Sequence, residues 1–441
     1  MSLSLRRPLK ASTALSAPAR GLALRVAWLA IARLGSQALM VVFTVLVARR
    51  LGSAGLGQYA FMAALLMVAN TLSTFGTDSL LIRRLRSEKD RSLLGSALAI
   101  QLVLSGLLIG AAFAWQVGEP TLPIETRAAW RVFALTLIPL AFYGVFSAAL
   151  RAYERMGAYM LLSLASALLQ TVGVAFALRP SAGLLGLAYL LLITQTAGAA
   201  CAAAFCISQI RGFRLSLRLS WHQLTSAFAA SWPLAALGLL TILHQRLGII
   251  LLGVIGGPAV TGWFAAAARV VEASKLAHNS LSGALLPALG QAELGARDRG
   301  AADASRQALG SSWKALFVLS IAAALTITLF ADPLTRLLFG GGFGPTASAL
   351  RVLAWALIPF TLNAYFSLTH VAAGTERPAL VAVTAGILVF ALLGALWIPR
   401  WGLMGASWST VIAECSQAGV YLIYRFRTRS LAPFGRPARE A

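Results

Sequence analysis

Four ionisable side chains lie within one apolar stretch of the sequence, and their types suit the binding of an anion. The run from Trp263 to Leu286 carries, at every third position, Arg269, Glu272, Lys275 and His278. Residues three apart are neighbours on an α-helix, so we expect Glu272 to reach both Arg269 and Lys275 while the row winds around the helix. An Arg269–Glu272 pair alone would be a structural clamp. The remaining positive charges indicate a site for an anion, since Arg and Lys can replace the water around negatively charged oxygens.

Two other apolar runs carry further basic and polar candidates. His244, Gln245 and Arg246 are consecutive near the middle of one run, and three such residues are more than a single interhelical hydrogen bond requires. Arg33 and Gln37 lie four residues apart on one face of another. Arg33 either reaches a central cleft or extends along its helix to the lipid headgroups. Because charges at membrane depth are costly, we take Arg33, Arg246, Arg269 and Lys275 as the candidate anion-binding residues.

Carboxyl and amide groups complete the candidate site. Glu272 and Glu414 are the acids near helix centres, and each either couples transport to a proton or holds neighbouring helices together. Asn70 and Asn363 either bind sugar hydroxyls or join helices by hydrogen bonds. The candidate polar lining of a cavity comprises Gln37, Asn70, His244, Gln245, His278 and Asn363.

The composition requires that these residues be positioned by membrane-spanning helices. The chain of 441 residues is 59% hydrophobic and only 12% charged, which leaves too little polar surface to cover soluble domains. The apolar runs are continuous, unlike the short alternating segments of a barrel, and an open sheet has unpaired edges in lipid. We predict twelve helices: Trp28 to Ala48, Gly57 to Asp78, Leu93 to Trp115, Trp130 to Leu150, Ala158 to Leu178, Leu184 to Ile207, Phe228 to Ile255, Trp263 to Leu286, Trp313 to Phe330, Val352 to Val371, Leu380 to Trp397 and Leu403 to Tyr424.

The basic residues between these runs predict the topology. In a soluble protein the net charge of +23 would suggest nucleic-acid binding. Here the Lys and Arg lie mostly in the connections between helices: the connections on one side of the membrane hold about 25 of them, and those on the other side about 8. The positive-inside rule then places both termini in the cytoplasm, and we expect no nucleic-acid partner. The three cysteines lie in apolar runs without metal-ligand spacing, so we expect no metal, no cofactor and no catalytic residues.

Internal repeats divide the chain into two halves. Gly52 and Gly57, which precede the second predicted helix, are echoed by Gly257 and Gly262 before the eighth. The Gly-Leu-x-Gly stretch at 183–186 likewise recurs at 402–405. Each half has an even number of helices, so the halves share one orientation and relate by an axis along the membrane normal. We predict a cytoplasmic segment (1–27), an N-lobe (28–207), a cytoplasmic linker (208–227), a C-lobe (228–424) and a basic cytoplasmic tail (425–441).

Motifs across nearly the whole chain carry a family resemblance. They are Ala48-Arg-Arg-Leu-Gly52 to Gly57-Gln-Tyr59, Gly262 to Arg269 ending in Leu286-Pro287, Leu338-Phe-Gly340 through Phe343 to Leu350, and Gly402 to Glu414. In their order they resemble the bacterial polysaccharide (O-antigen) flippase family of the multidrug/oligosaccharidyl-lipid/polysaccharide (MOP) exporter superfamily. The resemblance implies a MATE-like fold of two six-helix lobes. One departure is the seventh helix, where family members often have an acid and this chain has His244-Gln-Arg246.

The resemblance also implies a function without catalysis. It predicts a flippase of the bacterial inner membrane that moves an undecaprenyl-pyrophosphate-linked oligosaccharide to the periplasmic leaflet by alternating access. Arg33, Arg246, Arg269 and Lys275 would then bind the pyrophosphate. Membrane lipids and other polysaccharide assembly proteins are the further partners. A MATE-type multidrug or cation antiporter is the first alternative, but it would want acids and aromatics in the first lobe. A membrane polysaccharide polymerase or ligase would need a sizeable external loop, and a passive scaffold would leave the intramembrane cations unexplained.

Overall fold

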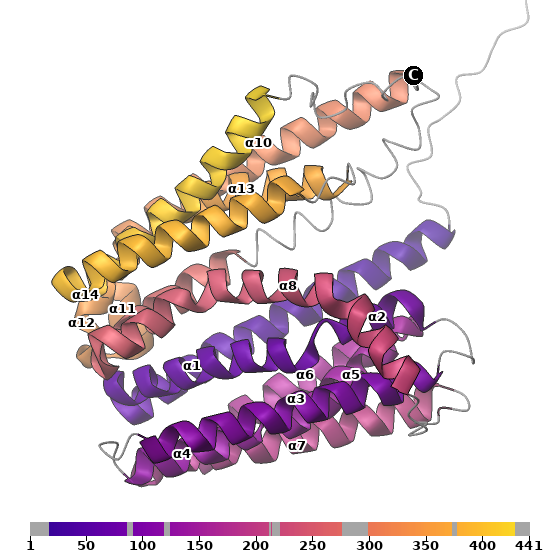
Figure 1. The fold of residues 1–441 in the computed structure, drawn as a ribbon. Coiled ribbons are helices and arrows are strands. Elements are labelled where there is room, and N and C mark those ends of the chain that lie inside the picture. Colours follow the sequence, from indigo (N-terminus) through magenta and orange to yellow (C-terminus); the bar gives the residue numbers. More distant parts are fainter. Residues whose placement is uncertain are drawn as a thin grey trace, which may run out of the picture.

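The computed structural model describes residues 17–85, 91–118, 124–210, 213, 221–275, 299–372 and 377–427 (Figure 1). Every regular element within these ranges is helical, which confirms the predicted all-α class. In the first half the helices are α1 (Ala17–Thr74), α2 (Thr77–Arg84), α3 (Arg91–Gly118), α4 (Ile124–Leu135), α5 (Leu137–Ala152), α6 (Met156–Ala177), the short η2 (Pro180–Ala182) and α7 (Gly183–Gln209).

The second half begins with α8 (Trp221–Leu251), which starts earlier than the expected Phe228 and ends in a π-helical turn, η3 (Leu252–Gly256). A helical stretch follows at residues 258–275. The remaining elements are α10 (Arg299–Leu329), α11 (Ala331–Phe339), η4 (Gly341–Phe343), α12 (Gly344–Ala354), α13 (Leu357–Ala372) and α14 (Arg377–Arg427).

The lengths of the apolar helices agree with a multi-pass membrane protein. Seven described helices are long and apolar enough to cross a bilayer, and nine crossings result if two bent helix pairs each count as one. The spans Leu34–Thr74 and Arg377–Phe426 contain 41 and 50 residues, which is about 60 Å or more of helix against a bilayer core of about 30 Å. Each of these two long helices must therefore cross the bilayer twice.

Glycines make these double crossings by breaking the helices. Gly52 has φ 71° and ψ −175°, and Gly402 has φ 49° and ψ −118°, conformations that a side chain disfavours. Counting both halves of each broken helix gives eleven crossings among the described residues. The helical stretch 258–275 coincides with the start of the remaining predicted run, the eighth (Trp263 to Leu286).

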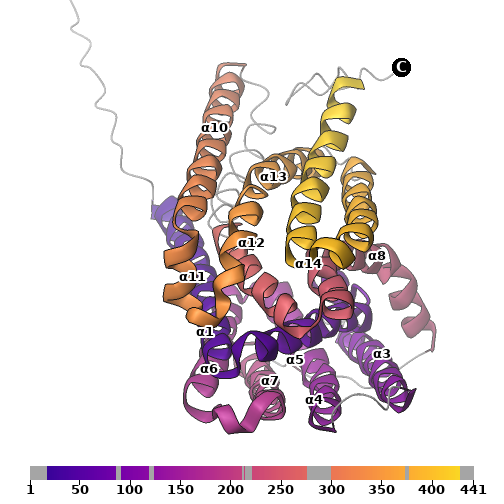
Figure 2. The ribbon, with the colours of Figure 1, turned by 90° about the vertical axis from the view of Figure 1, so that its left-hand side faces the viewer.

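The two halves of the chain form two groups of helices. Figure 1 shows α10, α13 and α14 in one group and α1 with α3 to α7 in the other. The groups approach each other where α11 and α12 lie and spread apart toward the C-terminus, and Figure 2 looks onto the end where they meet. We call it the break end, because Gly52, Gly257 and Gly402 lie there. Helix α8 packs against α1, α2 and α3 of the first half as well as α14 of the second, so it joins the groups.

The repeated glycines form the contact between the halves at the break end. A Cβ atom on Gly57 would lie 1.8 Å from the carbonyl oxygen of Pro258 and 2.7 Å from the nitrogen of Gly262. A Cβ atom on Gly262 would lie 1.9 Å from the carbonyl oxygen of Ser53. The contact is reciprocal, as expected for two repeats related by an axis that passes between them. Only glycine allows the two backbones to come this close.

Charged and aromatic groups reinforce the break end. Arg49 donates hydrogen bonds to the carbonyl oxygens of Leu337 and Leu338 at the end of α11, the second with an N–O distance of 2.8 Å. Arg50 donates to the last carbonyls of α6, and a cation there also opposes the negative end of the helix dipole. Phe339 and Phe343 of the second half are buried in one apolar cluster with Phe43 of the first.

At the opposite end, the connection between α1 and α2 packs onto α8. Phe75 has φ 45° and Gly76 has φ 70°, so the chain turns sharply here. The ring of Phe75 stacks on Phe228 of α8 with centroids 4.1 Å apart. A Cβ atom on Gly76 would lie 2.9 Å from the carbonyl oxygen of Ser231, so the backbones of α2 and α8 are again in close contact. We call this the α2 end.

Candidate functional site

A cavity of about 520 Å³ lies between the two halves of the chain. Among the described side chains, its first-half lining comes from α1 and is uncharged: Gln37, Met40 and Met67. All the described charged side chains that line it come from the second half: Arg246 on α8, Arg269, Glu272 and Lys275 on the stretch 258–275, and Glu414 on α14. His244, Gln245 and Asn363 also line it. The fold thus brings together charged candidates from three separate apolar runs.

One carboxylate bridges two arginines in this cavity. Glu272 Oε1 accepts a hydrogen bond from Arg246 at 3.0 Å, and Glu272 Oε2 accepts one from Arg269 at 3.1 Å. Arg269 is the neighbour expected from the three-residue spacing. The second partner of Glu272 is Arg246 and not the expected Lys275, because α8 runs beside the stretch 258–275. The Glu272 side chain is 32% exposed, so the bridge borders the open cavity.

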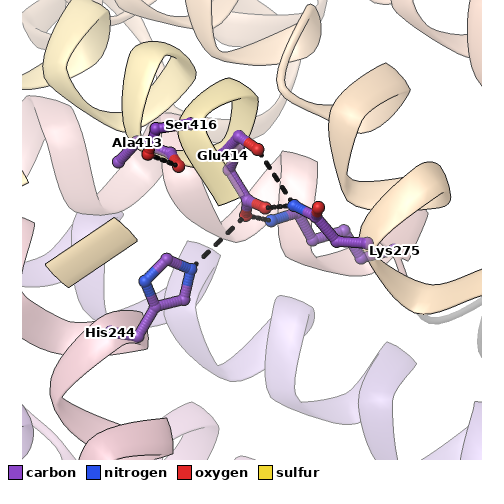
Figure 3. A network of polar contacts seen from close by, with 6 residues as sticks. His244, Lys275, Ala413, Glu414 and Ser416 are labelled. Carbon is purple, nitrogen blue, oxygen red and sulfur yellow. Dashed lines mark hydrogen bonds and ion pairs between the residues drawn. The ribbon is translucent and has the colours of Figure 1, made fainter. Parts of the chain in front are cut away.

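A second carboxylate is enclosed by three side chains (Figure 3). Glu414 Oε1 lies 2.8 Å from Lys275 Nζ and 4.0 Å from His244 Nε2. Glu414 Oε2 accepts a hydrogen bond of 2.9 Å from the amide of Asn363, which also donates to the Glu414 backbone carbonyl at 3.0 Å. The Lys275 ammonium lies 4.3 Å from the centre of the Phe360 ring. The Glu414 side chain is only 8% exposed, so these contacts fix a buried ion pair.

The described lining has a net positive charge with neutral His244. Three cations, Arg246, Arg269 and Lys275, face two carboxylates. Arg246 Nε is buried and has no hydrogen-bond partner in the described part of the chain, so one guanidinium still has a donor to offer. The arrangement can hold an anion in a low-dielectric space by charge-assisted hydrogen bonds.

Some sequence candidates do not join this group. Arg33 lies in α1, but its side chain is outside the described residues, as is all of His278. Asn70 does not line the cavity; its Oδ1 is buried in the first half without a partner among the described residues. The sequence reading missed Gln417 and Phe360, which both line the cavity. Gln417 lies one helical turn after Glu414, so its spacing was a usable signal, whereas nothing marked Phe360.

The described residues offer no obvious metal centre. They contain no group of three or more His, Cys, Asp or Glu residues that could hold a metal ion. Cys201, Cys206 and Cys415 are free thiols.

Comparisons with known proteins agree with this architecture. The family model described as polysaccharide biosynthesis protein matches residues 22–293. No curated protein matches at the sequence level. Among solved structures, an inward-facing multidrug resistance MATE family transporter of the MOP superfamily has a TM-score of 0.72 at 18% identity and covers 90% of this chain and 98% of its own.

Two further solved structures have the same fold. The lipid II flippase MurJ in an inward closed conformation also has a TM-score of 0.72, at 15% identity, covering 91% of this chain and 87% of its own. An outward-facing MATE family transporter has a TM-score of 0.65 at 19% identity, covering 92% of this chain and 96% of its own.

The fold and the charged cavity between its halves define a multi-pass membrane protein with the architecture of MOP superfamily transporters. Within that class, the chain belongs to the polysaccharide biosynthesis protein family.

Proposed function

We propose that this protein is a flippase that moves a pyrophosphate-linked oligosaccharide on a polyprenyl lipid, undecaprenyl in bacteria, across the inner membrane. Family membership supports a role in polysaccharide synthesis. The observation that carries the proposal is the net positive cavity in which Arg246 and Arg269 share one carboxylate. A pyrophosphate needs such a set of donors once it leaves water. The transported unit would be used to build a surface polysaccharide, such as O-antigen, exopolysaccharide or capsule.

The bridge suggests how the cargo is bound and released. Glu272 supplies one oxygen to each arginine when no cargo is present. A phosphate offers the same pair of oxygens with additional charge, so it competes for Arg246 and Arg269 and leaves Glu272 to rotate into the cavity. When the halves rearrange and water enters, Glu272 returns to the arginines and displaces the phosphate. No covalent bond changes in this cycle.

The topology of the proposed cycle follows from the positive-inside rule. Both termini lie in the cytoplasm, which places the α2 end on the cytoplasmic side and the break end on the periplasmic side. The halves, 28–207 and 228–424, rock about the cavity in alternating access. The lipid tail stays in the bilayer while the sugar and pyrophosphate pass between the halves.

An antiporter for cationic drugs is less well supported by the cavity. A cationic substrate needs acids or aromatic faces that are free of positive partners. Both described carboxylates in the cavity are already paired with Arg or Lys. The first-half lining consists of Gln37, Met40 and Met67, which carry no charge.

Deletion and complementation of the gene test the proposal. We expect the deletion strain to accumulate lipid-linked oligosaccharide on the cytoplasmic face and to lose surface polysaccharide. Wild type should restore both, and Arg246→Ala or Arg269→Ala at equal membrane abundance should not. Arg400→Ala is the matched control, because Arg400 is exposed and lies outside the cavity. Unchanged surface polysaccharide combined with increased drug sensitivity would replace the flippase with an antiporter.

A further inference from the structure

A second polar cluster lies in the first half, away from the cavity between the halves. Asp78 is in the first turn of α2, and Gln101 of α3 is fully buried beside it. The Gln101 amide nitrogen donates to Asp78 Oδ1 at 2.9 Å and to Thr77 Oγ1 at 2.8 Å. Asp78, the last residue of the second predicted helix, is half-buried. The cluster is therefore enclosed by protein on most sides.

Three oxygens of this cluster surround the space above Gly144 of α5. A Cβ atom at position 144 would lie 3.3 Å from Gln101 Oε1 and 3.5 Å from each carboxylate oxygen of Asp78. The absence of a side chain at Gly144 leaves this space to the oxygens.

The orientation of Gln101 is determined by its neighbours. Its NH₂ group must face Asp78, because a carbonyl oxygen there would be repelled by the carboxylate. Gln101 Oε1 consequently points toward Gly144, and it has no hydrogen-bond partner among the described residues. A fully buried acceptor without a partner is costly unless something else binds it.

No described cation pairs with the Asp78 carboxylate. The basic residue of α5 that follows Gly144 is Arg151, which is near enough to act electrostatically on Asp78 but forms no ion pair with it. The Arg151 guanidinium lies 5.1 Å from the centre of the Tyr159 ring and donates to the Ser147 carbonyl at 3.3 Å. The described ion pairs do not include Asp78. The cluster thus combines one negative charge with a neutral oxygen that lacks a donor.

We propose that Asp78 and Gln101 bind a small monovalent cation, of which sodium is the best fit, in the space above Gly144. Hard cations select oxygen ligands, and a single carboxylate balances a single positive charge. The ion would lie nearer the three oxygens than the Cβ position does, because that position is a bond length from Gly144 Cα. Ion–oxygen distances of about 2.3–2.6 Å are typical of an ion of this size. Water completes the coordination on the exposed side of Asp78.

The position of this site connects it to the rest of the molecule. Asp78 directly follows the turn at Phe75 and Gly76, which packs onto α8. Helix α8 continues to His244 and Arg246 in the cavity. A bound ion would therefore stabilise the turn that holds α8 against the first half. Ion binding itself does not depend on the proposed cargo.

Thermal unfolding of the purified full-length protein tests the site. Midpoints are measured in detergent at one pH, in sodium chloride and in choline chloride of equal ionic strength. We expect sodium to raise the midpoint in a saturable way, by about 1–3 °C at ten times its Kd. Asp78→Asn should abolish the sodium effect. Gly144→Ala should abolish it too, because the methyl group fills the space while both oxygen ligands remain.

Gly106→Ala is the matched control, since Gly106 is also on a helix of the first half and a Cβ there meets nothing within 4 Å. It should keep the sodium effect. Monodisperse elution of each variant during size-exclusion chromatography establishes that it is folded. Equal midpoints in sodium and choline would overturn the proposal, as would a sodium effect that survives both Asp78→Asn and Gly144→Ala. A midpoint that responds to pH but not to sodium would show that Asp78 takes up a proton instead, which also overturns it.

Discussion

Glu272 and Glu414 differ in how completely the protein encloses them, and this difference separates their roles at the residue scale. Glu414 is almost fully buried and is held by Lys275, His244 and Asn363. Glu272 is about one-third exposed and is held by two arginines. A buried ion pair is expensive to disturb, whereas a bridge beside open space can exchange partners. We therefore assign a structural role to Glu414 and an exchangeable one to Glu272.

Neutralising Glu272 should strengthen anion binding. In Glu272→Gln the arginines keep a neighbour of the same size but lose the competing charge. We expect inorganic pyrophosphate to bind the purified protein about five- to ten-fold more tightly, or about 1–1.4 kcal/mol. Isothermal titration calorimetry measures the change. Glu272→Asp, which keeps the charge, is the control and should not show the gain. Weaker binding by Glu272→Gln would contradict the exchange mechanism.

Removing Lys275 alone should destabilise the protein more than removing the whole ion pair. Lys275→Met leaves Glu414 buried without its cation, which costs about 3–5 kcal/mol. The double variant Lys275→Met with Glu414→Gln contains no unpaired charge and should recover much of this loss. Thermal unfolding in detergent compares the single variant, the double variant and wild type. Equal destabilisation by both would show that Glu414 does not depend on Lys275.

At the scale of elements, the double crossings depend on glycine backbone conformations. Gly52 and Gly257 have nearly the same dihedral angles, φ 71° with ψ −175° and φ 81° with ψ 169°. Gly183 and Gly402, which begin the last crossing of each half, have φ 56° and φ 49°. The repeated glycines of the sequence are therefore repeated turns of the chain. An L-residue at Gly52 or Gly257 is strained whatever the surrounding space.

Gly52→Ala should destabilise the protein although a Cβ there meets nothing within 4 Å. The cost is that of the backbone conformation, about 1–3 kcal/mol. Gly106→Ala, equally free of contacts but within a regular helix, should instead stabilise the protein by about 0.5–1 kcal/mol. Thermal unfolding of both variants in one detergent separates the conformational effect from general tolerance to alanine. Equal effects of the two substitutions would argue against a strained turn at Gly52.

At the scale of the whole molecule, the halves touch most closely at the break end. Gly57 and Gly262 bring two backbones into contact, and Arg49 adds hydrogen bonds between the halves. The alternating access proposed above requires this contact to open while the other end closes. Opening has to break the Arg49 hydrogen bonds and the packing of Phe43 with Phe339 and Phe343, as well as the backbone contact.

Gly57→Ala should shift the protein toward arrangements in which the break end is open. The added Cβ would lie 1.8 Å from the Pro258 carbonyl, so the present arrangement cannot accommodate it unchanged. Spin labels at the exposed Ile124 and Leu337 report the separation of the halves by pulsed electron paramagnetic resonance. We expect longer distances in Gly57→Ala than in wild type. The same labels in Gly106→Ala should report unchanged distances. Unchanged distances in Gly57→Ala would show that the backbone near Gly57 and Pro258 shifts locally and that the two halves do not separate.

The sequence by itself determined the all-α membrane fold, because the length of continuous apolar runs leaves no other way to satisfy the backbone in lipid. It also indicated the repeat, because the glycines recur at matching positions of the two halves. That Gly52, Gly183, Gly257 and Gly402 have positive φ was seen only in the structure. Arg269, Glu272 and Lys275 could be identified as a group because they share one helix. Their partners could not be identified, since Arg246 is 26 residues from Glu272, and Glu414 is 139 residues from Lys275, along the chain.

Only the tertiary structure decided which charges meet. Helical spacing alone predicted that Glu272 could pair with either of two cations on its own helix, Arg269 or Lys275. In the structure α8 crosses this helix and places Arg246 beside Glu272. Helix α14 places Glu414 beside Lys275. The space above Gly144 was equally hidden, because it forms from residues of three helices that are unremarkable in sequence. Continuous apolar runs indicate which segments are helical, but the pairing of charges depends on how helices pack against one another.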